Sequence, residues 1–246
     1  MRMSAESKAV RKKLLDEYYA SFYNSYLFDP DLQGFGIRYF EGGIDRHLQS
    51  YFCRRNRTKP LSEAKVLEIG GGDGQHLPFV RFKPESYTIL DIRELAPGIL
   101  EKNLVKSTYV KEVSFVLGDG ASMPFDDEGF DLVIGTCVLH HVDDVLGVLM
   151  EAKRVCKNGG EVIFILPTDP GLLNGLVKRV ISYRKLRSLG HPNPRLIYAL
   201  DHKNHVNSII SQFSFVFDSS VVNKKFRPLF FPSINLNLYI TLHATK

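Results

Sequence analysis

Short apolar runs alternate with helix-length stretches between residues 65 and 166, and this alternation constrains the fold more than any other feature of the sequence. Each run is rich in β-branched and aliphatic side chains and is bounded by Gly, Asp or Pro, as buried strands are. The runs are Lys65–Ile69, Tyr87–Ile92, Val113–Leu117, Phe130–Ile134 and Glu161–Leu166. Alternating strands and helices require crossover connections, so the sequence predicts a doubly wound, mostly parallel α/β sheet with both faces covered.

Helices are expected before and within this alternation. Apolar or aromatic residues recur at every fourth position through Ser7–Tyr26, which keeps one face of a helix apolar. A second short helix is expected over Ile44–Asn56. Val142–Lys157 is the clearest helix between two strands, and it is expected to stop at the Asn158–Gly160 turn.

The C-terminal part departs from the alternation. Residues 168–207 are mixed in character, with prolines and many basic residues. Two further strands are predicted over Phe213–Val222 and Leu236–Ala244. Polar and apolar side chains alternate through Asn235–Leu242, as in an antiparallel strand with one more polar face. A chain of 246 residues fits a single α/β domain.

Cysteine content and charge exclude several classes of protein. Cys53, Cys137 and Cys156 form no CxxC pair, which argues against a disulfide scaffold or structural zinc site, and no metal site is predicted. No apolar run reaches the ~18 residues of a membrane-spanning helix, and Met1–Asn24 lacks the apolar core of a signal peptide, so a cytoplasmic location is expected. The net charge of +5 fits an anionic partner such as nucleic acid, a membrane surface or a phosphorylated substrate.

A glycine-rich turn follows the first strand, in the segment Val66–His76. Glycines at a strand-to-helix turn let backbone N–H groups approach a ligand closely, because no Cβ stands between them. A dinucleotide site of the G-x-G-x-x-G type starting at Gly70 would need a third glycine at position 75, which is Gln75. A P-loop is excluded because no Gly-Lys-Ser/Thr follows.

The spacing Glu68-x-Gly70-x-Gly72-x-Gly74 resembles the first motif of class I S-adenosylmethionine-dependent methyltransferases, of the small-molecule, type 11-like family. The resemblance extends over residues 60–168 and includes four further motifs in the family's order. These are Asp91 at the end of the second strand, Gly118–Phe125, Phe130–Val142 and Glu151–Gly160.

The resemblance implies a Rossmann-like, seven-stranded sheet whose C-terminal strand is antiparallel. It also implies a single domain of four parts. They are an N-terminal helical cap (1–59), a cofactor-binding core (60–168), a lid or acceptor insert (169–207) and C-terminal strands (208–246).

The resemblance implies a site for S-adenosyl-L-methionine. In the family an acidic residue at the position of Asp91 accepts hydrogen bonds from the ribose hydroxyls, and one at the position of Asp119 accepts from the adenine amine. A lone Asp at a strand end is more often a cap or turn residue. The residues expected to bind the cofactor are Glu68, Gly70, Gly71, Gly72, Gly74, Asp91, Ile92, Asp119, Gly120, Ala121 and Thr136.

Histidines are the candidates for moving a proton. A hydroxyl acceptor needs a general base, whereas an amine needs little help. His141 and His202 are the predicted catalytic residues. The alternative for His141 is a pocket residue that helps to hold the cofactor, and for His202 and His205 it is a solvated helix face. The residues expected to contact the acceptor are His140, Tyr183, Arg184, Arg195 and His205.

Residues 171–188 combine helical apolar spacing with dense positive charge. In the family this insert commonly covers the acceptor, so a basic amphipathic helix here suits an anionic acceptor or peripheral contact with a lipid surface. The alternative is a helix packed on the sheet with a charged outer face. Nucleic acid is not an expected partner, since the sequence has no long basic stripe with interleaved aromatics.

The sequence therefore predicts methyl transfer to a small-molecule hydroxyl of a sugar, nucleotide-sugar or lipid-linked intermediate, in specialised or surface-polysaccharide biosynthesis. One alternative is N-methylation of an amine or a phospholipid headgroup. The others are a non-catalytic cofactor-binding protein and an NAD-dependent oxidoreductase. The acceptor's identity and the oligomeric state are left open.

Overall fold

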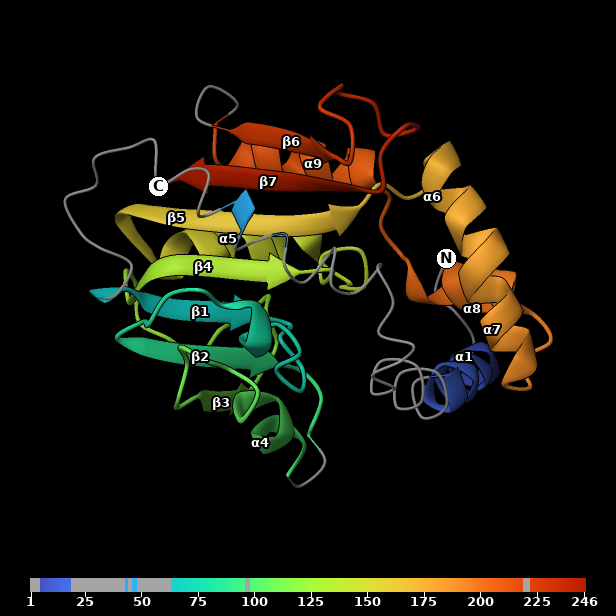
Figure 1. Cartoon of the computed structure of the whole chain (residues 1–246), viewed down its shortest axis with the longest axis horizontal. Coiled ribbons are helices and arrows are strands. Elements are labelled where there is room, and N and C mark those ends of the chain that lie inside the picture. Colours follow the sequence, from blue (N-terminus) through green and yellow to red (C-terminus); the bar gives the residue numbers. More distant parts are fainter. Residues whose placement is uncertain (1–4, 19–42, 44–45, 48–62, 96–97, 219–221) are drawn as a thin grey trace.

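The computed structural model describes residues 5–18, 43, 46–47, 63–95, 98–218 and 222–246. They form a seven-stranded sheet in the order β3-β2-β1-β4-β5-β7-β6 (Figure 1). The strands are β1 (Lys65–Ile69), β2 (Ser86–Asp91), β3 (Ser114–Leu117), β4 (Phe130–Thr136), β5 (Cys156–Pro167), β6 (Asn223–Arg227) and β7 (Tyr239–Thr245). Strands β1 to β5 are parallel and β7 pairs antiparallel with both β5 and β6, which confirms the predicted fold class.

Helices connect and flank these strands. They are α1 (Ala5–Tyr18), the 3-10 turn η3 (Leu77–Phe79), α4 (Ile99–Leu104), α5 (Val145–Val155), α6 (Leu172–Val177), the π-helical segment η4 (Lys178–Ser182), α7 (Tyr183–Ser188), α8 (Pro194–Asp201) and α9 (Val206–Val216). No helix among the described residues is both long and apolar enough to cross a membrane.

The core consists of two apolar layers, one on each face of the sheet, because side chains alternate along a strand. On β1, Leu67 packs in the layer that also contains helices α5 and α9, whereas its neighbour Val66 packs in the opposite layer. On β4, Val133 and Leu132 divide between the layers in the same way. This double burial explains why the parallel strands are continuous apolar runs in the sequence.

Helices α6 to α8 and α1 lie together beyond the carboxyl ends of the parallel strands (Figure 1). A small apolar cluster joins them, made by Tyr18 of α1, Leu186 of α7 and Ile197 of α8. The insert and the N-terminal helix therefore lie on the side of the sheet to which the loops after β1, β2 and β4 also lead. In open α/β sheets ligands bind at this edge.

Two predictions of local structure need correction. Phe213–Val222 is not a strand: Phe213 and Val216 lie on the buried face of α9, and β6 starts only at Asn223. Apolar residues at Val206, Ile209, Phe213 and Val216 have the three-to-four-residue spacing of a helix, which the run of apolar residues in this segment obscured.

The helix expected over Val142–Lys157 is shorter, because α5 covers Val145–Val155. Asp144 caps its start by accepting a hydrogen bond from the Gly147 backbone N–H at 2.9 Å. The chain enters β5 directly at Cys156, so the expected stop at Asn158–Gly160 lies within β5 instead.

The helix expected over Ser7–Tyr26 is present as α1 up to Tyr18, and residues 19–26 lie outside the described part of the chain. Most of the helix expected over Ile44–Asn56 lies outside it too.

Candidate active site

The glycine loop after β1 is held against the end of β2. The Gly70 N–H donates to the Leu90 carbonyl at 2.7 Å, and the Gly72 N–H donates to Asp91 Oδ2 at 2.9 Å. Gly70 and Gly72 have φ of +69° and +50°, a conformation that other residues rarely adopt. A Cβ on Gly70 would also collide with the Val138 side chain. The loop therefore needs glycine at these positions for its backbone path.

A cavity of about 410 Å³ lies beside this loop, at the carboxyl ends of the parallel strands. The volume is within the range of small-molecule sites. Its walls come from the glycine loop, the end of β2, the loop after β3 and the end of β4. Ten of the eleven residues expected to bind the cofactor line it: Glu68, Gly70, Gly71, Gly72, Asp91, Ile92, Asp119, Gly120, Ala121 and Thr136.

Asp91 presents a buried carboxylate to this cavity, with 5% of the residue exposed. Its Oδ1 accepts from the Arg93 backbone N–H at 2.9 Å and from Arg93 Nε at 3.2 Å, and its Oδ2 accepts from Gly72. A carboxylate has about four lone-pair sites, so one on Oδ2 remains for a ligand hydroxyl, which would compete with the long contact from Arg93 Nη2 at 3.5 Å.

Asp119, Ile92 and Thr136 offer three different surfaces to the cavity. Asp119 Oδ1 accepts from the Ala121 N–H at 2.9 Å, which leaves Oδ2 available to a ligand donor. The Ile92 side chain is 70% exposed at the cavity wall, where it offers an apolar face to a ring. Thr136 Oγ1 is buried without a hydrogen-bond partner among the described residues. Such an atom is costly unless a ligand or water satisfies it.

The comparisons with known proteins agree with this geometry. Residues 67–164 match the family model of the methyltransferase domain. Sterol 24-C-methyltransferase of Gibberella zeae is 31% identical over 168 residues, which is 63% of this chain and 43% of the relative. Demethylmenaquinone methyltransferase of Staphylococcus epidermidis is 34% identical over 89 residues, 36% of each chain. The region that matches the family model extends from β1 into β5 and includes the loops after β1, β2, β3 and β4.

The matched part of the chain, residues 67–164, is a methyltransferase domain of the class I, S-adenosylmethionine-dependent type. A solved structure of a methyltransferase of this kind from Thermotoga maritima has a TM-score of 0.55, with 20% identity over 94% of this chain and 98% of that one, which shows the shared fold. The chain spans half or less of the length of the curated relatives named above. S-adenosylmethionine is the cofactor of the family. The buried Asp91 carboxylate, the open glycine loop and the unpartnered Thr136 hydroxyl fit its polar groups.

Two of the expected cofactor residues have a structural explanation in this methyltransferase. Glu68 is 1% exposed and accepts a hydrogen bond from Tyr87 Oη at 2.7 Å, with His76 Nδ1 3.5 Å from its other oxygen. These three side chains form a buried polar group beneath the glycine loop. Gly74 does not line the cavity: its φ of +78° and the close approach of Leu77 explain the glycine.

Three histidine rings gather beside the cavity at the glycine loop. The ring centroids of His140 and His141 are 3.9 Å apart, and those of His140 and His202 are 4.4 Å apart. His141 lines the cavity itself, whereas His140 is buried behind it, with Nδ1 lacking a partner among the described residues. The sequence predicted roles for all three residues but not that the fold packs their rings together.

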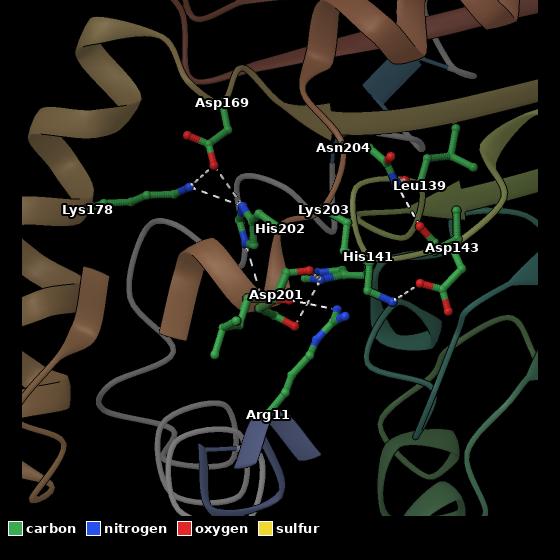
Figure 2. A network of polar contacts seen from close by, with 12 residues as sticks. Arg11, Leu139, His141, Asp143, Asp169, Lys178, Asp201, His202, Lys203 and Asn204 are labelled. Atoms are coloured by element: carbon green, nitrogen blue, oxygen red, sulfur yellow. Dashed lines mark hydrogen bonds and ion pairs between the residues drawn. The ribbon is translucent and has the colours of Figure 1, made fainter. Parts of the chain in front are cut away.

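Each of two histidines is held by an aspartate (Figure 2). His141 Nδ1 lies 3.2 Å from Asp201 Oδ1 and 3.2 Å from the Asp201 carbonyl oxygen. His202 Nδ1 lies 2.8 Å from Asp169 Oδ2. Because a carbonyl or carboxylate oxygen accepts, each Nδ1 carries a proton and Nε2 of the neutral ring keeps its lone pair. Asp169 and Asp201 are the functional candidates that the sequence analysis missed.

Lys178 completes the second pair. Its Nζ lies 2.5 Å from Asp169 Oδ2 and 3.2 Å from His202 Nδ1 (Figure 2). Burial alone would raise the pKa of Asp169, but the hydrogen bond from His202 and the charge of Lys178 hold it well below its usual value. Asp169 is therefore a fixed negative charge that orients His202.

Burial also keeps two of the histidines neutral. It lowers the pKa of His202 to about 4; Lys178 acts in the same direction and the hydrogen bond to Asp169 opposes it. Burial lowers the pKa of His140 well below its usual value, and the nearby His141 and His202 add to that effect. At neutral pH the rings of His140 and His202 carry no charge.

The remaining residues expected to contact the acceptor do not line the cavity. The Arg184 and Arg195 side chains are exposed, and His205 is exposed at the start of α9. The Tyr183 ring packs against the ring of Tyr198 with centroids 5.5 Å apart. Burial and the charge of Asp169 raise the pKa of Tyr183.

The histidine cluster is also the place where described residues could hold a metal ion. Ring nitrogens of His140, His141 and His202 lie within 4.8 Å of one another. The ammonium group of Lys178 lies 3.2 Å from His202 Nδ1, however, and its positive charge disfavours a cation beside it. We keep the prediction that methyl transfer here requires no metal and test it below.

Proposed function

We propose that this protein transfers a methyl group from S-adenosylmethionine to a hydroxyl oxygen of a small-molecule acceptor. The observation that carries the proposal is the placement of His141. This residue lines the same cavity as Asp91 and the glycine loop, and Asp201 holds its Nδ1. When bound, the cofactor supplies an electrophilic methyl group, and the protein has to orient the acceptor and take up its proton.

His141 is the proposed general base. Its Nδ1 carries a proton because it contacts the Asp201 carbonyl oxygen, so Nε2 is free to accept the hydroxyl proton. Asp201 is buried and is positioned to stabilise the imidazolium that forms, as the aspartate does in other His–Asp pairs. The side chain of His141 is 25% exposed, which gives a substrate access to the ring.

His202 is the second candidate for this role. Its Nδ1 is held by Asp169, and its ring centroid lies 5.1 Å from that of His141. It does not line the cavity, so in this proposal it positions His141 and the acceptor. If His202 is instead the base, its substitution will lower turnover at least as much as that of His141.

A lipid-linked acceptor is the substrate class that we propose. The relatives reported above are named for methylation of a sterol at carbon 24 and of demethylmenaquinone, so they favour an acceptor with a lipid part but give no support for a hydroxyl as the methylated group. The basic segment 171–188 supports an acceptor that carries a phosphate, such as a lipid-linked or nucleotide-linked sugar. N-methylation of an amine or phospholipid headgroup is the alternative, and it would not depend on a histidine base.

The test is a methyl-transfer assay with radiolabelled S-adenosylmethionine and a panel of acceptors. The panel contains lipid-linked sugars, nucleotide sugars and phosphatidylethanolamine. We expect label on a hydroxyl of a lipid-linked or nucleotide-linked sugar and a large loss of turnover in His141→Gln. His191→Gln, outside the cavity, is the matched control and should retain full turnover. Transfer to an amine that His141→Gln leaves intact would overturn the proposed chemistry.

A further inference from the structure

Positive charge is concentrated in the C-terminal third of the chain. Residues 170–246 contain eleven Lys and Arg residues but only two acidic residues, Asp201 and Asp218. The first 169 residues contain 21 basic and 25 acidic residues, so the net positive charge of the protein comes entirely from the C-terminal third. Asp201 is buried, which leaves the surface of this part with little negative charge.

Exposed apolar side chains occur in two segments of the same part of the chain. On α6 and η4 they are Leu172, Leu176, Val180 and Ile181, each at least half exposed. The spacing of the first three keeps them on one side of the helical segment. In the β6–β7 connection they are Leu229, Phe230, Phe231 and Leu236, with Phe230 85% and Phe231 64% exposed. These eight residues are called the apolar surface below.

The two segments of the apolar surface are joined at the start of α6. The Leu173 N–H donates to the Asn235 carbonyl at 2.9 Å, and the Leu172 N–H contacts Asn235 Oδ1 at 3.3 Å. The Asn174 side chain donates to the Leu238 carbonyl at 3.2 Å. Figure 1 shows the β6–β7 connection beside α6, although about sixty residues separate them in the sequence.

The β6–β7 connection is held in one shape, because buried Asn237 ties its two sides together. Asn237 Oδ1 accepts from the Leu229 N–H at 2.7 Å, and Nδ2 donates to the Phe231 and Ser233 carbonyls at 2.9 and 2.8 Å. The Arg227 guanidinium lies 4.7 Å from the Phe230 ring centroid. An ordered loop therefore holds two phenylalanine rings in solvent with a cation directly beside one of them.

We infer that the apolar surface docks on an anionic lipid bilayer. Exposed aromatic and aliphatic side chains insert at the boundary between headgroups and acyl chains. Nearby cations, including Arg227, Arg179 and Arg184, bind phosphate groups of the lipids. A second copy of this chain is a poor occupant, because two surfaces of the same positive charge would repel each other.

This inference deepens the lipid-linked acceptor proposed above and rests on it for its biological purpose, but its test needs no methyl transfer. Docking would place helices α6 to α8, at the carboxyl edge of the sheet, next to the membrane in which such an acceptor resides. A protein that binds vesicles but methylates nothing would leave the docking surface standing and remove the proposed function. Methyl transfer without vesicle binding would support the proposed function and overturn the docking surface.

The test is co-sedimentation of the full chain with vesicles of phosphatidylcholine, with and without phosphatidylglycerol. We expect binding to the anionic vesicles, which weakens as salt is raised. The double variant Phe230→Ser/Phe231→Ser should bind at least ~10-fold more weakly, since two ring insertions are lost. Arg179→Gln/Arg184→Gln should weaken binding to anionic vesicles only.

Phe215→Ser is the matched control, because Phe215 is 79% exposed on α9 and lies outside the apolar surface. It should bind vesicles as the unmodified protein does. Binding of S-adenosylhomocysteine by each variant shows that the fold is intact. Absence of binding to anionic vesicles would overturn the inference, as would an equal loss in Phe215→Ser. A dimer in light scattering that Phe230→Ser/Phe231→Ser dissociates would also overturn it.

Discussion

His202 Nδ1 lies 2.8 Å from Asp169 Oδ2, although 33 residues separate the two in the chain. Asp169 follows the end of β5 and His202 follows α8, so this contact closes the whole insert of helices α6 to α8 onto the sheet. Asp201, the neighbour of His202, contacts His141 at the cavity wall. The adjacent residues Asp201 and His202 therefore connect two contacts: His202 fastens the insert to the end of β5, and Asp201 holds the proposed base His141.

Substitution of the Asp91 carboxylate should weaken cofactor binding strongly. Asp91→Ala removes both the ligand acceptor and the partner of the Gly72 N–H. Loss of a charge-assisted hydrogen bond costs about 1.5–3 kcal/mol, so we expect the Kd for S-adenosylhomocysteine to rise by ~10- to 100-fold or more. Gly72→Val should have the same effect, because φ is +50° and a Cβ would lie 3.0 Å from Arg93.

Calorimetric titration of the two folded variants measures this effect. Asp126→Ala, at an exposed acidic residue that does not line the cavity, is the control and should bind normally. Retained binding in both Asp91→Ala and Gly72→Val would show that the cofactor lies elsewhere.

The two histidine–aspartate pairs should separate in single-turnover kinetics. His141→Gln removes the proposed base and should lower the transfer rate by ~100-fold or more, with cofactor affinity nearly unchanged. Asp201→Asn keeps the shape of the side chain but removes the charge that stabilises the imidazolium, so a smaller loss is expected. His202→Gln should chiefly raise the KM for the acceptor. If His202→Gln lowers the transfer rate more than His141→Gln, the two roles must be exchanged.

The stability of the protein should fall as the pH is lowered from about 6.5 to about 4. The pKa of His202 is about 4 in the folded protein and 6.5 when exposed, so the unfolded chain binds more protons within this range. For each pH unit by which the pH falls between about 6.5 and 4, one such histidine lowers the free energy of unfolding by about 1.4 kcal/mol. Urea unfolding at several pH values measures the slope. His202→Gln should flatten it, and an unchanged slope would contradict the neutral buried ring.

Removal of metal ions should leave the protein's activity unchanged. Lys178 supplies positive charge beside the three rings, which disfavours a cation at the cluster. We expect the same rate before and after dialysis against EDTA, with no gain on adding Zn²⁺ or Mn²⁺. A rate that EDTA abolishes and one of these ions restores would make the histidine cluster a metal site.

The buried polar group beneath the glycine loop should be required for stability more than for chemistry. Tyr87→Phe removes the hydrogen bond to buried Glu68 and leaves that carboxylate oxygen unsatisfied. The expected cost is about 1–3 kcal/mol in the free energy of unfolding. Denaturant titration measures it, with the exposed Tyr109→Phe as the control. An equal, small effect in both variants would remove the structural role assigned to Glu68.

The sheet could be predicted because each of its parallel strands has a recognisable pattern within its own short segment of sequence. Runs such as Lys65–Ile69 are mostly apolar because both of their faces are buried, and glycine or aspartate marks their ends. The glycine-loop side of the cavity was predictable for the same reason: Gly70, Gly72 and Asp91 lie at the ends of adjacent strands. Helix α9 was not, since a short apolar segment such as Phe213–Phe217 has no clear period.

The acceptor side depends on contacts between distant segments, which the sequence does not record locally. Nothing around Asp169 or Asp201 marks either residue as the partner of a histidine before the insert folds back. Arg184 and Arg195 were expected to contact the acceptor because of their charge, but both are exposed. The charge of a residue does not determine whether its side chain points into a cavity or into solvent. The pairing of α6 with the β6–β7 connection likewise exists only in three dimensions.

Thermal unfolding with added ligands tests the central claim, a cofactor site at the glycine loop, most directly. S-adenosylmethionine, S-adenosylhomocysteine and NAD are compared at equal concentration. A ligand at ~100 times its Kd adds about 2.7 kcal/mol to the folded state, which raises Tm by several degrees. We predict this rise with the two adenosyl ligands, none with NAD, and at most half of it with the adenosyl ligands in Asp91→Ala. A rise with NAD alone, or with none of the three, would contradict the account.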